Sequence, residues 1–254
     1  MFPYRDENAT IRTPIVTLLV IGVNVAVWIL YQGAGSPVPL ARSVCNSGLI
    51  AGELTGRLPA GTEFEVGPNL ICSTDAGRGV GHLLTSMFLH GSWMHLLGNM
   101  WFLWIFGNNV EDSMGRFRFG VFYLLSGLAA AAAQVALTPA SPVPMVGASG
   151  AISGVMGGYL VLYPRVRVWT FVPLGFFLTS IALPAWSMLI YWLLLQGLSA
   201  ALVLGSESIG GVAFWAHIGG FLAGVLLIKL FARTDYLQQH RRAQWEPRRT
   251  GWQR

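Results

Sequence analysis

Residues 212–231 read VAFWAHIGGFLAGVLLIKLF, and this segment decides the fold class. Its ionisable side chains are His217 near one end and Lys229 near the other, and the rest is almost entirely apolar. A helix rises 1.5 Å per residue, so about twenty residues cross the roughly 30 Å of hydrocarbon in a bilayer. The segment therefore predicts a transmembrane helix.

Five earlier segments have the same apolar character, and we place the six spans near residues 14–31, 83–106, 117–137, 149–163, 185–204 and 212–231. The 254-residue chain is 54% hydrophobic and 11% charged, whereas a soluble domain carries about 25% charge. We expect an all-α polytopic membrane protein, a bundle of six transmembrane helices. The apolar stretch 168–183 is interrupted by Pro173 and Gly175 and borders Pro184, so we interpret it as interfacial or re-entrant. A seventh span is the alternative.

Six spans place both termini on one side of the membrane. With both termini inside, thirteen Arg and Lys residues lie inside and three outside, namely Arg42, Arg57 and Arg78. The positive-inside rule favours this orientation, and it explains the net charge of +5 without nucleic acid as a partner. The chain then divides into a cytoplasmic N-terminus (1–13), a membrane domain (14–232) with a long external first loop (about 32–82), and a basic cytoplasmic tail (233–254). We interpret the tail as a topogenic charge cluster.

Both cysteines, Cys45 and Cys72, fall in the external loop. In an oxidising compartment they could form a disulfide, and two free thiols are the alternative. Metal binding is less favoured because no CxxC motif or neighbouring histidine set accompanies them.

Polar side chains inside the spans are energetically costly and call for an explanation. Asn99 lies twelve residues before Glu111, and His217 lies twelve residues before Lys229. Ser149 lies sixteen residues before Arg165. These separations correspond to about 18 to 24 Å of helix. Three different helices therefore present polar groups at nearly the same depth, in the outer half of the bilayer. The other intramembrane polar residues are Asn24, His95, Gln134, Ser153 and Gln196.

The fourth span is too short to cross the bilayer alone. The preceding TPASPVPMVG (138–147) contains three prolines and cannot be helical. Because irregular backbone at membrane depth is tolerated only inside protein or beside water, Ser149 should begin a helix within a hydrated indentation.

Ser149 and His217 are candidates for a nucleophile and its general base, since a neutral imidazole can take the proton of a serine hydroxyl near pH 7. An oxyanion would need donors. The Ser149 N–H at a helix N-terminus is one candidate, and Asn99 and His95, four residues apart on one helix face, are two more.

Small residues recur every four positions on two spans. The rows are Gly150, Gly154 and Gly158 on the fourth span and Ala216, Gly220 and Gly224 on the sixth. Such rows favour close helix packing, which is the role that we assign to Gly150, Gly154, Gly220 and Gly224.

Three motifs resemble those of the rhomboid intramembrane serine proteases. Gly147-Ala148-Ser149-Gly150 resembles their GxSG motif, His95 to Asn99 matches HxxxN, and Ala216 to Gly224 is similar to AHxxGxxxG. The motifs fall on the second, fourth and sixth spans, and the resemblance covers nearly the whole of 14–231.

The resemblance implies a Ser149–His217 dyad, without an acidic third member, that cleaves membrane proteins in or beside their transmembrane segments. It implies an oxyanion hole made by Asn99, His95 and the Ser149 backbone, and needs neither a cofactor nor a metal. The loop 205–211 would be similar to the family's cap, and the fifth span, together with the second, to its substrate gate. The expected partners are membrane-protein substrates and the lipid bilayer, with no nucleic acid. The expected location is a bacterial inner membrane with the active site opening outward.

The chain also departs from the family pattern. The Trp-Arg pair that many relatives carry before the second span is Gly81-His82, which leaves the anchoring of the first loop in question. The aromatic residue often found four positions after the nucleophile is Ser153, so His217 must be oriented by another group. His90 matches a frequent family histidine, and we expect it to hydrogen-bond within the first loop.

Two rival functions remain. A catalytically silent rhomboid-like protein that binds transmembrane clients is the main alternative, although such proteins typically lose the Ser or the His. A secondary transporter is less favoured because no intramembrane charge and no inverted repeat is found. HExxH and GxSxG signatures are absent from the sequence, which disfavours a zinc protease and an α/β-hydrolase.

Overall fold

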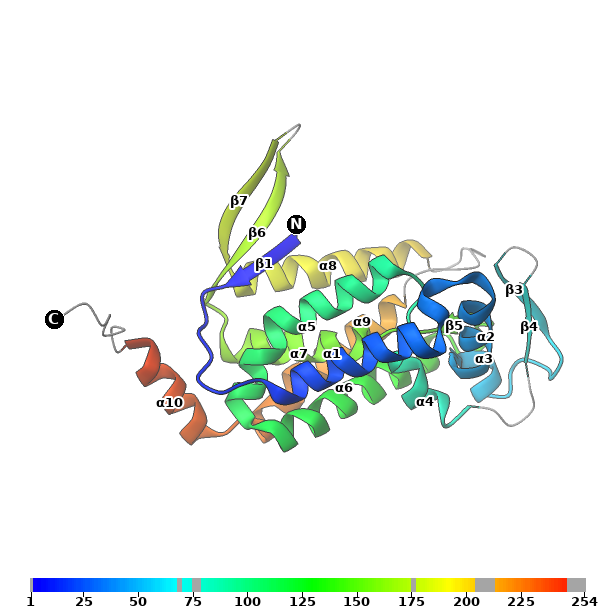
Figure 1. Cartoon of the computed structure of the whole chain (residues 1–254), viewed down its shortest axis with the longest axis horizontal. Coiled ribbons are helices and arrows are strands. Elements are labelled where there is room, and N and C mark those ends of the chain that lie inside the picture. The colour runs from blue at the N-terminus through cyan, green and yellow to red at the C-terminus, as the bar shows by residue number, and fades with distance from the viewer. Residues whose placement is uncertain (1, 68–69, 75–78, 175–176, 204–212, 246–254) are drawn as a thin grey trace.

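Six long helices pack side by side in the computed structural model, which describes residues 2–67, 70–74, 79–174, 177–203 and 213–245 (Figure 1). The bundle confirms the predicted all-α membrane architecture. Helices α6, α8 and α9 are long and apolar enough to cross a membrane, whereas residues 15–31 and α7 form shorter apolar helices. The six are α1 (Ile15–Ala26) with a π-helical continuation η1 (Val27–Tyr31), α5 (Trp93–Met114), α6 (Arg116–Leu137), α7 (Ser149–Leu162), α8 (Ala185–Val203) and α9 (Phe214–Phe231).

Helix α7 lies at the centre of the bundle. Every residue from Gly150 to Tyr159 is buried. A Cβ atom at Gly220 would collide with the carbonyl oxygen of Gly150, and a Cβ at Gly224 would collide with that of Gly154. The two small-residue rows therefore face each other, and the backbones of α7 and α9 touch where a side chain would not fit.

Helix α5 begins ten residues later than the predicted start of the second span at residue 83. The chain first forms α4 (His82–Thr85) and a 3₁₀ turn, η3 (Ser86–Phe88). Helix α5 starts after Ser92, whose Oγ accepts a hydrogen bond from the His95 N–H at 3.1 Å. The predicted start of the second span was wrong because it was placed from apolar composition alone, which does not reveal the N-cap residue that begins the helix.

The first loop is folded. It contains η2 (Gly33–Gly35), α2 (Pro37–Ser47), α3 (Ala51–Leu54) and a hairpin of β3 (Glu63–Gly67) and β4 (Leu70–Ser73). A disulfide joins Cys45 of α2 to Cys72 of β4, which decides between the two alternatives for the cysteines. Strand β2 (Leu49–Ile50) pairs with β5 (Pro144–Met145), so the loop holds the segment that leads into Ser149.

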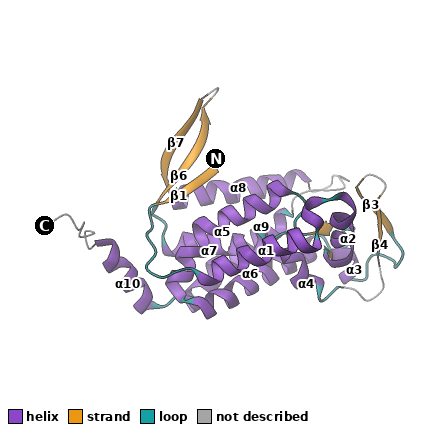
Figure 2. Ribbon diagram, in the orientation of Figure 1, coloured by secondary structure: helices purple, strands orange, loops and turns teal. Residues whose placement is uncertain are grey.

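A three-stranded sheet stands at the other end of the bundle (Figure 2). Its order is β1-β6-β7, formed by β1 (Phe2–Asp6), β6 (Arg167–Leu174) and β7 (Phe177–Pro184), with antiparallel pairing. The stretch 168–183 is thus a β-hairpin, neither a re-entrant segment nor a seventh helical span. Pro173 is accommodated because it lies beyond the part of β6 that pairs with β1, where β6 is an edge strand.

The tail does not simply extend from the bundle as a charge cluster. Residues Thr234–Trp245 form α10, which packs against α5. The buried ring of His240 contacts Asp112 Oδ2 at 3.0 Å and Asn8 Oδ1 at 2.8 Å. The N-terminal segment and α10 therefore meet at the same end of the bundle.

Candidate active site

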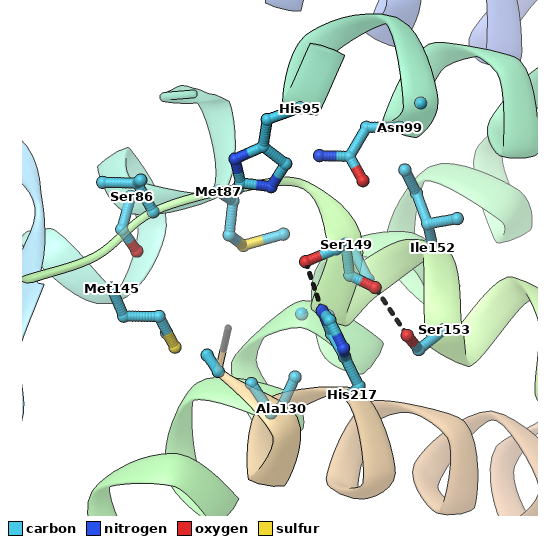
Figure 3. Close-up of a pocket in the computed structure, with 18 of the residues that line it drawn as sticks. Ser86, Met87, His95, Asn99, Ala130, Met145, Ser149, Ile152, Ser153 and His217 are labelled. Carbon is cyan, nitrogen blue, oxygen red and sulfur yellow. Dashed lines mark hydrogen bonds between the residues drawn. The ribbon is translucent and has the colours of Figure 1, made fainter. Parts of the chain in front are cut away.

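A cavity of about 710 Å³ opens within the bundle, lined by residues of α5, α6, α7, α8 and α9 and by the segment before α7 (Figure 3). Ser149, His217, Asn99 and His95 all line it. Ser149, His217 and Asn99 are the polar groups that the sequence places at a common depth on three helices, and the fold brings them into one cavity.

Ser149 is the first residue of α7, and the turn before it requires glycine. Gly147 has φ +129°, and its N–H donates a hydrogen bond to the Ser86 carbonyl at 2.9 Å. A Cβ at Gly147 would stand 2.8 Å from His95 Nε2. Glycine thus supplies a backbone conformation that other residues rarely adopt and leaves room for the His95 ring.

The Ser149 hydroxyl lies 2.7 Å from His217 Nε2. His217 occupies the first turn of α9 and is 8% exposed. The dashed line between the two residues in Figure 3 marks this contact. A hydroxyl and an imidazole are therefore in direct hydrogen-bond contact where two bilayer helices meet.

The other ring nitrogen of His217 also has a partner. His217 Nδ1 lies 2.8 Å from Gln196 Oε1 of α8. An amide oxygen only accepts hydrogen bonds, so Nδ1–H donates to Gln196 and Nε2 is left to accept the Ser149 hydroxyl proton. The Trp192 ring, one turn earlier on α8, lies 5.8 Å from the imidazole between centroids. From the sequence, Gln196 could be identified only as an intramembrane polar residue. No motif or spacing predicted its contact with His217.

Ser153, which replaces the family aromatic, takes a different role. Its hydroxyl donates a hydrogen bond to the Ser149 carbonyl at 2.6 Å. Trp192 approaches the imidazole from α8 instead, so the aromatic contact comes from another helix.

Side-chain donors from α5 converge on the space beside Ser149. Asn99 is buried, and its Nδ2 has no hydrogen-bond partner among the described residues. His95 Nδ1 accepts from the Gly91 N–H at 3.4 Å, which leaves Nε2–H free to donate. His95 and Asn99 both point toward Ser149 in Figure 3. Together with the Ser149 N–H, they are three candidate donors in the same cavity.

Other flagged residues lie apart from this cluster. Asn24 Nδ2 donates to the Val20 carbonyl of its own helix at 2.7 Å, and Gln134 Oε1 accepts from the Ala216 N–H at 3.1 Å. The His90 N–H donates a hydrogen bond to Gln32 Oε1 at 2.8 Å. The ring packs edge-on against His95. The expected cap, 205–211, lies outside the described residues.

A model of the Rhomboid domain family matches residues 78–234, more than half of the chain and inclusive of all three motifs. The chain belongs to the rhomboid family. With its apolar helices, this rhomboid is an integral membrane protein.

Named rhomboids from several sources are similar to this chain. It is 31% identical over 153 residues to Rhomboid-like protein 11, chloroplastic, of Arabidopsis thaliana, covering 59% of this chain and 52% of that protein. It is 30% identical over 173 residues to Rhomboid protein 1, mitochondrial, of Saccharomyces cerevisiae, covering 64% and 45%. Rhomboid protease GluP of Bacillus subtilis is 41% identical over 78 residues, covering 31% and 15%. The chain thus spans about half the length, or less, of these relatives.

Proposed function

We propose that this rhomboid is an intramembrane serine endopeptidase that cleaves transmembrane segments of other proteins with a Ser149–His217 dyad. The observation that carries the proposal is the 2.7 Å contact between Ser149 Oγ and His217 Nε2 inside a cavity of the apolar bundle. The name of one relative, a rhomboid protease, supports the same reaction class.

The chemistry follows from the atoms in the cavity. His217 Nε2 takes the hydroxyl proton as Ser149 Oγ attacks the scissile carbonyl carbon. The carbonyl oxygen becomes negative and receives hydrogen bonds from Asn99 Nδ2, His95 Nε2 and the Ser149 N–H. The imidazolium then gives its proton to the departing amine, and the peptide bond breaks to leave an acyl-enzyme. Water, deprotonated by His217, hydrolyses the ester and restores the hydroxyl.

The proposed reaction needs no metal or other cofactor. The proposal also includes the orientation of the protein in the membrane. We place both termini in the cytoplasm of a bacterium, with the protein in the inner membrane and the cavity opening outward. The excess of positive charge in the segments on the side of the termini supports this orientation. Tyr159, on the same helix as Ser149 but ten residues further along, contacts Asp6 of the N-terminal strand, so the nucleophile lies away from the end where the termini meet.

The test is cleavage of a model single-span substrate in proteoliposomes. We expect the wild type to cleave and Ser149→Ala to be inactive. Ser126→Ala is a matched control, since Ser126 is buried on α6 outside the cavity and its hydroxyl has no hydrogen-bond partner within the described part of the chain. Cleavage by Ser149→Ala would refute the dyad. A wild type that binds the substrate without cleaving it would favour the silent client-binding alternative.

A further inference from the structure

We propose that Gln196 is a positioning residue that holds His217 in the tautomer and ring orientation required of the general base. This inference rests on the proposed protease function. It adds a member to the site that neither the motifs nor the family match assigns.

The hydrogen bond from His217 Nδ1–H to Gln196 Oε1 has the geometry of a base and its orienting group, at 2.8 Å. In serine proteases with a catalytic triad, an aspartate accepts a hydrogen bond from the histidine Nδ1–H. This keeps the proton on Nδ1 and leaves Nε2 free to act as the base toward the serine. An amide oxygen can do the same without a charge. Inside a bilayer this matters, because a carboxylate at this depth would be costly to desolvate.

Helix α8 supplies both contacts that orient the imidazole. Gln196 fixes the ring through Nδ1, and Trp192 lies one helical turn away with its ring 5.8 Å from the imidazole. Within the described residues, the titratable side chain that acts on His217 from another helix is His95 of α5, and the uncharged Ser149 hydroxyl of α7 contacts its Nε2.

The experiment compares Gln196→Met, Gln196→Glu and Leu198→Ala in proteoliposomes. Methionine keeps the length of the side chain but removes the acceptor, so we expect kcat to fall at least about tenfold with KM nearly unchanged. Glutamate restores an acceptor and should recover part of kcat, while moving the acid limb of the pH–rate profile to higher pH, since a carboxylate stabilises the imidazolium. Leu198 is exposed on the same helix and controls for general perturbation of α8.

A second readout does not depend on turnover. ¹⁵N NMR of histidine-labelled protein should report the Nδ1–H tautomer for His217 in the wild type and its loss in Gln196→Met. A wild-type kcat and an unchanged tautomer in Gln196→Met would overturn the positioning role. If the wild type fails to cleave but shows the Nδ1–H tautomer, the contact with Gln196 stands and the proposed function fails.

The β6-β7 hairpin projects from the bundle, roughly perpendicular to the helices (Figure 1). We infer that one face of this hairpin lies on the lipid surface. The sequence from 168 to 203, which covers most of the hairpin and all of α8, has no Asp, Glu, Lys or Arg. An apolar hairpin exposed to water would promote aggregation, so lipid or protein must shield its surface from water.

The two faces of the sheet differ in charge. Arg5, Glu7, Arg167 and Trp169 share one face: Arg167 Nε bonds to Glu7 at 2.7 Å, and the Arg5 guanidinium lies 5.9 Å from the Trp169 ring. The opposite face of the hairpin is uncharged and carries Val168, Thr170, Val172, Thr179 and Ile181, with Asp6 of β1 beside Val168 at the end near the bundle.

The uncharged face turns toward the bundle, because Val168 and Thr170 at its base are buried. On β7, directly opposite Thr170, Ile181 of the same face is exposed. The adjoining helix α8 exposes Trp186, Ile190 and Leu194, as a helix in contact with lipid does. The uncharged face therefore continues the apolar surface of a membrane-spanning helix, which favours lipid over a protein partner.

Adjacent residues of β7 provide a matched test. Thr179 and Ser180 point to opposite faces, and both native cysteines are in the disulfide, so single cysteines can be spin-labelled selectively. In liposomes, labels at Thr179→Cys and Ile181→Cys should be more accessible to oxygen, and a label at Ser180→Cys more accessible to a water-soluble nickel chelate. Equal nickel accessibility at 179, 180 and 181 would overturn lipid contact. Protection of 179 and 181 from both reagents would also overturn it, because protein would then cover that face.

Discussion

The phenol of Tyr159 donates a hydrogen bond to Asp6 Oδ2 at 2.7 Å, which ties the N-terminal strand to the helix that begins at Ser149. Asn109 Nδ2 donates to the same oxygen at 2.8 Å. Burial raises the pKa of Asp6 to about 6, because desolvation of the carboxylate outweighs the hydrogen bond from Tyr159. A carboxylate at the sheet end of α7 thus carries an energetic penalty when ionised.

This penalty predicts a dependence of stability on pH. Because the pKa of Asp6 is higher in the folded protein than its ordinary value of 3.8, the folded state binds more protons between about pH 4 and 6. The contribution of Asp6 to the free energy of unfolding therefore falls as pH rises through this window, by up to about 3 kcal/mol. Thermal unfolding in detergent should show Asp6→Asn stabilised relative to wild type at pH 8 and nearly equal to it at pH 4.

Glu65→Gln, a change at an exposed carboxylate of β3, is the matched control and should leave the wild-type pH dependence intact. An Asp6→Asn protein that keeps the full wild-type dependence would show that another group is responsible.

Asn99 should contribute to turnover more than to stability. Its Nδ2 donates to no group in the described ranges of the chain, so replacement by alanine removes no donated hydrogen bond seen there. If the group donates to the oxyanion, Asn99→Ala should lower kcat by roughly 10- to 1,000-fold with little change in KM. Kinetics in proteoliposomes would measure this. A wild-type kcat combined with a lower Tm would make Asn99 a helix-packing residue instead.

Gly224 should tolerate no side chain. A Cβ there would meet the Gly154 carbonyl, so Gly224→Ala must separate α7 from α9. We expect a loss of about 1 to 3 kcal/mol in stability and reduced cleavage. Gly22→Ala is the control, because Gly22 lies in α1 with nothing within 4 Å of the added Cβ, and alanine favours a helix there. Equal melting temperatures for the two variants would refute close packing at Gly224.

The disulfide should stabilise the first loop. Cys45 and Cys72 are 27 residues apart, and closing a loop of this length contributes about 3 kcal/mol. Cys45→Ser with Cys72→Ser should lower Tm and expose residues of the loop to protease earlier than those of the bundle. Proteolysis followed by mass spectrometry would detect the order of cleavage, and identical kinetics with and without the disulfide would contradict the prediction.

The sequence predicted the bundle and much of the candidate site because both depend on local pattern. The third span was predicted to start at residue 117, and α6 starts one residue earlier, at Arg116. Counting residues from Asn99, Ser149 and His217 to the charged residue that follows each of them placed the three at one depth. The structure brings these three residues into one cavity. Helix rise alone makes such counts reliable.

The remaining features depend on tertiary contacts that no local pattern records. Gln196 and His217 are 21 residues apart on different helices, and only the packing of α8 against α9 brings them together. The hairpin escaped notice because Pro173 and Gly175 suggested an irregular segment, whereas pairing with β1, more than 160 residues away, supports a sheet. The fold of α10 onto α5 likewise depends on His240 meeting Asp112 and Asn8.

The most direct test of the central claim is the site of labelling by a serine-directed fluorophosphonate in proteoliposomes, mapped by mass spectrometry. We predict that Ser149 of the wild type is labelled and that His217→Ala, with its fold verified by circular dichroism, is not. Labelling of Ser149 at the wild-type rate in His217→Ala, or no labelling of Ser149 in active wild-type protein, would contradict the dyad.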